Sequence, residues 1–307
     1  MTAGGRIAAT ASGAPFRQGA LFAFGAVLIW SFWPAWTRHG VIGHLSVDDI
    51  VLLRFGVGGL LFLPFLLAQA RRIRPRAWAI GFGLAVCQGA PFVLLVATGL
   101  RFAPANHAAA LTTGLSPLFA AVLGCVLFGE TVTKQRAAGM VLILVGAFAL
   151  AYSGARPAGL GDMLFVAAAA IVSIYLVFVA RSGLSGFEAA AMVSVYSMVA
   201  FVPYYLLFGE QRIASAPWIE VAQQGIYQGV LMAFLSFLLL NAGIARLGAT
   251  RASAMIALVP ALTLLLAIPL LGEWPTPNEA MCALLVGAGV YLATHWRTGT
   301  NSHPNAA

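Results

Sequence analysis

Two glutamines lie near the middle of long apolar stretches, where a polar side chain is costly unless it finds a partner. Gln88 stands in the first half of the sequence and Gln228 in the second half. Each amide has two donor hydrogens and an acceptor oxygen, so it can bind a carboxylate or an ammonium group without carrying charge. Gln224 and Tyr227 share a helical face with Gln228 by the i, i+3, i+4 spacing. These residues are candidates for binding a small polar solute, the alternative being that the glutamines join neighbouring helices as structural hydrogen bonds.

Four aromatic residues are candidates for the same site. Trp30 and Trp33 share a helical face beside Pro34. Trp30 lies too deep for an interfacial belt, whereas Trp33 is close enough to the end of its stretch to belong to one. An indole can contact an ammonium group through its π face or an apolar side chain through its area. Tyr175 and Tyr196 lie at similar depth in other stretches, where they either line the same cavity or pack helices together.

Two prolines lie inside apolar stretches, each preceded by residues with hydroxyl groups. Pro117 follows Thr113, and Pro260 follows Ser253. Proline has no backbone N–H, so it leaves a carbonyl of the preceding turn free and loosens the helix. We interpret Pro117 and Pro260 as hinges at which helices bend during gating, with static kinks as the alternative.

Two ionisable residues border apolar stretches. Arg54 lies a few residues into one of them, where it can reach lipid headgroups or pair with Asp48 or Asp49, and a pairing that controls a gate is the alternative. His107 lies in the first turns of another stretch. Histidine titrates near neutral pH, which makes His107 a candidate proton carrier, although a histidine at the membrane interface is the simpler interpretation. We group both residues with the prolines as candidate gating residues.

Other chemistry lacks the residues that it needs. No Asp, Glu, Lys or Arg falls near the middle of an apolar stretch, so we expect neither a buried proton-coupling carboxylate nor a phosphate-binding cation. The three cysteines form no CxxC pair, and the sequence contains no Walker, HExxH or GxSxG motif. We expect no catalytic residue, no metal and no cofactor.

The elements that must position these residues are membrane-spanning helices. Of the 307 residues, 61% are hydrophobic and only 8% are charged, namely 17 Lys plus Arg and 9 Asp plus Glu. A soluble domain of this length needs about 75 charged residues, so a soluble globular enzyme is excluded. The mean hydropathy of +0.92 leaves hydrocarbon as the solvent for most of the chain. The net charge of +8 indicates no nucleic-acid partner, because cytoplasmic loops of membrane proteins collect Lys and Arg.

Ten apolar segments of about 20 residues predict an all-α polytopic membrane protein with ten transmembrane helices. They cover residues 19–37, 50–69, 77–99, 103–127, 136–153, 160–180, 187–208, 217–240, 249–271 and 276–296. With the N-terminus in the cytoplasm, 12 of the 17 Lys and Arg residues fall on the cytoplasmic side, in keeping with the positive-inside rule. We therefore predict that both termini are cytoplasmic and that the lipid bilayer is a bacterial-type inner (plasma) membrane.

The two halves of the chain repeat each other at an offset of 143 residues. Residues 116–146 align with 259–289, and five pairs coincide: Pro117 with Pro260, Gly129 with Gly272, Glu130 with Glu273, Thr133 with Thr276 and Gly146 with Gly289. Residues 1–153 and 154–307 then hold five helices each. An odd number of crossings inverts one half relative to the other, as in secondary transporters with a midplane site, whereas duplication that only enlarged the bundle is the alternative. Glu130 and Glu273 then lie at opposite faces, where we expect them to cap helix junctions.

This pattern resembles a known family. The ten helices in two halves, the proline, GExxT and glycine shared by both halves, and Arg54 in VLLRFGVGGLLF look like the EamA group of the drug/metabolite transporter superfamily. The segments WSFWPAWTRHG and PFVLLVATGLRFAPANHAAALTTGLSPLFAA are similar to those of YddG-type amino acid exporters. The resemblance implies export or exchange of small metabolites without ATP.

A cavity lined by amides, phenols and indoles without fixed charge suits a cargo that is polar but net neutral. We therefore expect an exporter of amino acids or related metabolites that works by alternating access. An exporter of lipophilic compounds is the alternative, and a membrane-embedded enzyme would need a reactive dyad that the sequence does not offer. The expected partners are the small-molecule substrate and the bilayer; the sequence does not define the oligomeric state, and a monomer is compatible with it.

Overall fold

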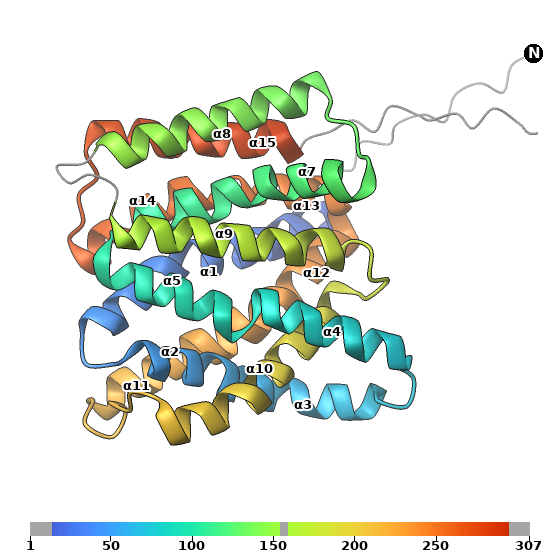
Figure 1. The fold of residues 1–307 in the computed structure, drawn as a ribbon, viewed down its shortest axis with the longest axis vertical. Coiled ribbons are helices and arrows are strands. Elements are labelled where there is room, and N and C mark those ends of the chain that lie inside the picture. Colours follow the sequence, from blue (N-terminus) through green and yellow to red (C-terminus); the bar gives the residue numbers. More distant parts are fainter. Residues whose placement is uncertain (1–13, 154–158, 295–307) are drawn as a thin grey trace, which may run out of the picture.

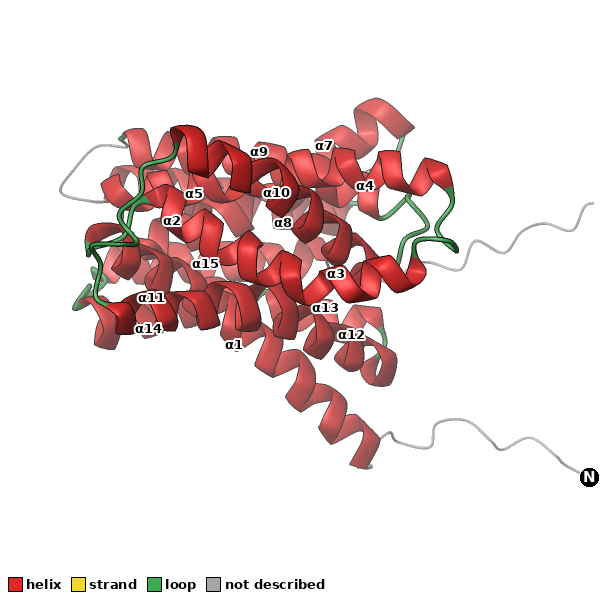
Figure 2. Ribbon diagram, turned by 90° about the horizontal axis from the view of Figure 1, so that it is seen from below, coloured by secondary structure: helices red, strands yellow, loops and turns green. Residues whose placement is uncertain are grey.

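A computed structural model describes residues 14–153 and 159–294. Every regular element in these two ranges is helical, and they contain no strand. The helices lie side by side, and most of the loops gather at two ends of the bundle (Figure 2). Three segments are π-helical turns, labelled η, which interrupt longer α-helices.

The helices are connected as Figure 1 shows. The first half contributes α1 (Ala14–Ile42), α2 (Val47–Leu52), η1 (Leu53–Val57), α3 (Gly58–Gln69), α4 (Pro75–Gln88), α5 (Ala90–Phe102), α6 (Ala105–Ala108), η2 (Ala109–Thr113), α7 (Gly114–Phe128) and α8 (Lys134–Ser153). The second half contributes α9 (Leu160–Val179), α10 (Gly186–Phe208), α11 (Trp218–Gly225), η3 (Ile226–Leu235), α12 (Ser236–Leu247), α13 (Ala249–Ile256), α14 (Val259–Leu271) and α15 (Pro277–Thr294).

Seven helical runs of the described chain are long and apolar enough to cross a membrane. They are Phe16–Ile42, Val47–Gln69, Pro75–Phe102, Ala105–Phe128, Leu160–Val179, Gly186–Phe208 and Trp218–Leu247. Two shorter apolar helices, Val259–Leu271 and Pro277–Ala293, add to them. The predicted class of all-helical membrane protein is thus confirmed, while the count of ten crossings stays a prediction.

The segment expected as one helix over residues 77–99 is broken at Gly89. α4 ends at Gln88 and α5 begins at Ala90, because Gly89 adopts φ −86° and ψ −139°. The N–H of Ala90 donates instead to the hydroxyl of Ser197, at 3.3 Å. A Cβ atom on Gly89 would lie 2.1 Å from that hydroxyl oxygen, so the break requires a glycine.

Both predicted hinge prolines lie beside irregular backbone. Pro117 cannot donate to the carbonyl of Thr113, and the hydroxyl of Ser116 donates to that carbonyl at 3.3 Å. The π-helical turn η2 ends at Thr113. Pro260 lies in the first turn of α14, directly after the break that separates α13 from α14. The expected continuous helix over 249–271 is therefore two helices, and whether either proline acts as a hinge stays a prediction.

Helices α8 and α15 come from the two halves and pack in close, antiparallel contact at one edge of the bundle (Figure 1). A Cβ atom on Gly146 would meet the carbonyl oxygen of Cys282 at 3.1 Å, and one on Gly289 would meet that of Gly139 at 2.7 Å. These two contacts exchange under the 143-residue offset. The repeated glycine seen in the sequence therefore serves the same contact from both sides.

This contact predicts opposite effects for two glycine-to-alanine substitutions. Gly289→Ala forces a Cβ atom against backbone of α8, which should lower the stability of the folded protein by about 1–3 kcal/mol. Gly83→Ala is the matched control, because a Cβ atom there meets nothing within 4 Å and alanine favours helix. Thermal unfolding of the purified protein in detergent measures both. Equal melting temperatures for the two variants would contradict the close approach of α8 and α15.

Candidate functional site

A small cavity lies where segments from both halves meet. Its lining comprises Arg54, Phe55, Gln88, Tyr175, Ala190, Val193, Ser194, Ala233 and Phe237. The volume that the centre of a water-sized sphere can occupy inside it is ≈ 20 Å³. A single water needs about 10–15 Å³ by this measure, so the cavity is closed to any larger molecule in this conformation.

Arg54 brings a positive charge into this cavity. Its side chain belongs to η1, and the residue is only 5% exposed. Its guanidinium carbon lies 4.9 Å from the centre of the Trp33 ring and 5.7 Å from that of the Phe55 ring. Its Nε and Nη1 atoms have no hydrogen-bond partner in the described part of the chain. Arg54 is therefore a desolvated cation whose contacts include aromatic faces but no carboxylate among the described residues.

This position corrects two expectations, a shallow Arg54 and a cavity without fixed charge. The aspartates expected to pair with Arg54 have other partners: Asp49 accepts from the hydroxyl of Tyr205 at 2.5 Å, and Asp48 from the backbone N–H of Glu210 at 2.8 Å. The helix also begins earlier than expected, at Val47, so Arg54 lies roughly 10 Å along it.

Gln88 lies at the last residue of α4, beside the break at Gly89. Its Oε1 atom is buried and has no hydrogen-bond partner in the described chain. Gln88, which has an unpartnered acceptor, and Arg54, which has unpartnered donors, thus both line this cavity. These groups line the same space without satisfying one another.

The amide of Gln228 has a full set of partners in this conformation. It accepts from the indole N–H of Trp33 at 3.0 Å and donates to the hydroxyl of Thr37 at 2.9 Å and to Oε1 of Gln224 at 3.3 Å. Gln228 is 0% exposed. Two of these bonds join η3 to α1, which is the structural role left open above, so a role in substrate binding stays a prediction.

Gln224 and Tyr227, which were predicted to share a helical face with Gln228, also connect α11 and η3 to α1. Gln224 donates to the backbone carbonyl of Trp36 at 2.8 Å, and the hydroxyl of Tyr227 donates to that of Ile29. Neither Gln224 nor Tyr227 is among the residues that line the cavity.

The predicted aromatic residues divide into two groups. Tyr175 lines the cavity, and Trp30 packs edge-on against its lining residue Phe237, with 6.1 Å between ring centres. Trp33 stacks on Phe92 as well as on Arg54. Tyr196 is separate from this group, because its hydroxyl donates to the backbone carbonyl of Trp78 at 3.2 Å, outside the cavity lining.

An ion-pair cluster joins the two halves at one end of the bundle, which we call the Glu273 end. Arg38 of α1 lies 2.5 Å from the carboxylate of Glu273 and donates to the backbone carbonyls of Leu100 and Ala103. Glu273 also accepts from the N–H of Ala105.

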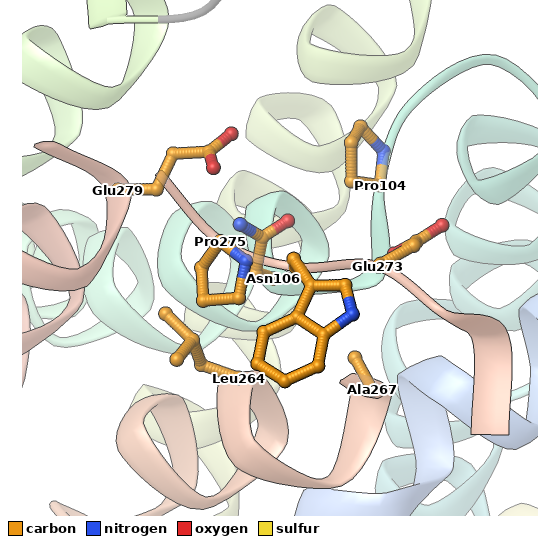
Figure 3. Close-up of a pocket in the computed structure, with 8 residues that line it drawn as sticks. Pro104, Asn106, Leu264, Ala267, Glu273, Pro275 and Glu279 are labelled. Atoms are coloured by element: carbon orange, nitrogen blue, oxygen red, sulfur yellow. The ribbon is translucent and has the colours of Figure 1, made fainter. Parts of the chain in front are cut away.

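His107 lies in the same region and links α6 to the start of α9 and of α15. Its Nδ1 atom lies 2.8 Å from Asp162, and its Nε2 atom lies 3.5 Å from Glu279. A pocket of ≈ 190 Å³ for the centre of a water-sized sphere lies beside it. In the view of Figure 3, Asn106 lies between the carboxylates of Glu273 and Glu279 in this pocket.

A second cluster lies at the other end, the Glu130 end. Glu130 pairs with Arg181, which follows α9, and its carboxylate lies 3.6 Å from Arg136. α9 runs from Leu160, close to Asp162 at the Glu273 end, to Val179, just before Arg181 at the Glu130 end, about 30 Å by the rise of a helix. That length matches the hydrocarbon thickness of a bilayer.

The two clusters are related by the repeat, and this relation between them was not predicted from the sequence. Adding 143 to Arg38 and Glu130 gives Arg181 and Glu273, so each arginine pairs with the glutamate of the opposite half. The two glutamates, expected as helix caps, are thus ion-pair partners. The arginines share the glutamates' offset in the sequence, so that signal was available. Nothing in the sequence pointed to Ser194, Ala233 or Phe237 as lining residues.

These features define an integral membrane transporter, because the bundle is apolar, its halves repeat, and polar groups from both halves enclose an interior cavity. Comparison with protein families agrees. The EamA-like transporter family matches residues 17–152 and 159–295, and the chain belongs to this family.

Two relatives of the chain are described as transporters. The chain is 28% identical, over 225 residues, to a probable terminal-alkyne amino-acid exporter of Streptantibioticus cattleyicolor, covering 71% of this chain and 74% of that protein. It is 23% identical, over 262 residues, to an uncharacterized transporter of Archaeoglobus fulgidus, covering 83% of this chain and 91% of that one. A crystal structure of a protein with 22% identity superposes with a TM-score of 0.61, over 90% of this chain and 96% of that chain. It shares the fold.

The hydrogen bonds of the two glutamines predict different costs on truncation. Gln228→Ala removes three bonds between buried groups, so it should lower the stability by about 1–2 kcal/mol. Gln88→Ala removes an acceptor that has no partner and should leave the melting temperature within error of the wild type. Thermal unfolding in detergent compares the two, and an equal loss for both variants would contradict this assignment.

Proposed function

We propose that this protein exports small metabolites that are net neutral, above all amino acids, and that it binds them in the cavity between Arg54 and Gln88. One observation carries the proposal: the cavity is lined from both halves and contains unpartnered donors and an unpartnered acceptor. A zwitterion supplies the complementary groups. The description of the Streptantibioticus relative as an amino-acid exporter supports the same class of cargo.

We further propose that residues 1–153 and 154–307 form two inverted repeats of five crossings each, with both termini in the cytoplasm of a bacterial-type inner membrane. The two family matches, one to each half, support the division. The antiparallel contact of α8 with α15 supports the inversion, since these helices hold equivalent places in the two halves.

Transport then proceeds by alternating access, with the Glu273 end outside and the Glu130 end inside. In the present conformation an arginine–glutamate pair joins the halves at each end, which supports an occluded state. Opening either side requires that one pair separate while the other holds. The breaks at Gly89 and before Pro260 are points at which helices can bend.

The two ion pairs predict opposite shifts in access. Glu273→Gln should favour the outward-open state and Glu130→Gln the inward-open state, each by roughly fivefold, because a partly exposed pair contributes about 1 kcal/mol. A cysteine introduced as Ser194→Cys in a cysteine-free background reports access through its labelling by an impermeant thiol reagent. Vesicles of both orientations give the two sides. Equal labelling of the two variants from both sides would rule out the assignment of the pairs as gates.

The cargo is tested by counterflow in proteoliposomes loaded with unlabelled amino acids. We expect accumulation of radiolabelled apolar amino acids and competition among them. An exporter of lipophilic cations would show the reverse, with competition by lipophilic amines and none by amino acids, and that result would replace the proposed function. The buried charge of Arg54 argues against such a cargo, since like charges repel at short range in a closed cavity.

A further inference from the structure

We infer that Arg54 holds the carboxylate of the transported molecule and that the Oε1 atom of Gln88 receives its ammonium group. This inference rests on the proposed function and narrows its cargo to α-amino carboxylates. Arg54 is then a residue that determines specificity, in place of the lipid-facing or gating role expected from the sequence.

The first step of the argument is the burial of Arg54 without a counter-ion. A buried cation is costly unless it is paired and hydrogen-bonded. Aromatic faces of Trp33 and Phe55 compensate in part, but they leave Nε and Nη1 without an acceptor in the described chain. Such an arrangement fits a site whose anion arrives with the ligand.

The second step is that neighbouring carboxylates are committed elsewhere. Asp49 binds the hydroxyl of Tyr205 and the backbone N–H of Arg212. Glu220, on α11, binds His44. The described residues that line the cavity contain no acidic side chain. The anion for Arg54 must therefore come from a bound molecule.

The third step is the acceptor on Gln88. Gln88 lines the same cavity, and its buried Oε1 atom bonds neither Arg54 nor any other described group. A molecule with an acceptor at one end and a donor at the other satisfies both residues at once. An α-amino acid carries these two groups on the same carbon atom, Cα.

The fourth step is the remaining lining, which sets the side chain and the charge of the cargo. Phe55, Val193 and Phe237 are apolar, and Tyr175 offers a ring face. A single guanidinium among the described lining residues matches one carboxylate, whereas a phosphate ester calls for further cations. The site therefore fits an amino acid with an apolar side chain, once the cavity has widened.

Three compounds test separately whether the site recognises the carboxylate and the ammonium group of the substrate. Leucine carries both charged groups, leucinamide lacks the carboxylate, and 4-methylpentanoate lacks the ammonium group. Each is tested as a competitor of radiolabelled leucine counterflow. For the wild type we expect leucinamide to compete roughly 10- to 100-fold more weakly than leucine, the usual effect of losing a charge-assisted hydrogen bond.

In Arg54→Gln, competition by leucine should fall to the level of competition by leucinamide, so that the preference for leucine disappears. Arg54→Lys should retain part of this preference. Gln88→Ala should weaken leucine while leaving competition by 4-methylpentanoate unchanged. Arg101→Gln is the matched control: the side chain of Arg101 is 41% exposed, and Glu210, 4.0 Å away, is itself 48% exposed. Such an exposed pair contributes little, so this variant should behave as the wild type.

Ligand-induced shifts in melting temperature provide a readout that does not depend on flux. Leucine should raise the melting temperature of the wild type and of Arg101→Gln but not that of Arg54→Gln. If Arg54→Gln keeps the preference of the wild type for leucine over leucinamide, the inference is wrong and the proposed function stands. If chloride stabilises the wild type as leucine does, Arg54 holds an inorganic anion and the inference also fails. If the wild type transports no amino acid, the proposed function fails first and the inference with it.

Discussion

In hydrocarbon, every polar group must find its partner inside the protein, and the interior of this bundle follows from that constraint. Gln228 is satisfied on all sides by Trp33, Thr37 and Gln224. Asp49 is satisfied by groups of the loop after α10 and by Tyr205. Buried polar atoms without a partner occur on five described residues: Trp36, His39, Arg54, Gln88 and Thr112. Two of these residues, Arg54 and Gln88, line one cavity. Unpartnered groups that share one cavity can be satisfied together by a bound molecule, which is the basis of the site proposed above.

In the proposed mechanism, the repeat gives this cavity one route to each side of the membrane. Contacts made by α8 with α15, and by Arg38 and Arg181 with glutamates, exchange when the halves are exchanged. Two arrangements related in this way have similar energies, because each keeps one set of contacts and gives up its counterpart. A modest free energy from a bound molecule is then enough to move the protein between them.

The class of protein, the helices and the repeat could be predicted from the sequence, because hydropathy and spacing are properties of the chain alone. The break at Gly89 was missed because an apolar run continues through it, although Pro91 two residues later indicates a helix start. The depth of Arg54 was missed because the helix boundary depends on the capping of Ser46 and Asp49. The absence of a partner for Oε1 of Gln88 among the described residues depends on packing between helices that are distant in the sequence, so no local sequence pattern predicts it.

The two ion pairs are equivalent in sequence but unequal in strength. The side chains of Arg38 and Glu273 are 18% and 25% exposed, whereas those of Arg181 and Glu130 are each 35% exposed. Both pairs have further partners: Arg38 donates to two backbone carbonyls and Arg181 to that of Val177, while Glu130 lies near Arg136. Water weakens the second pair more than the first. In the proposed orientation, the protein without substrate therefore spends more time in the inward-open state than in the outward-open state. For the proposed exporter, this state exposes the binding site to the cytoplasm, where the metabolites accumulate.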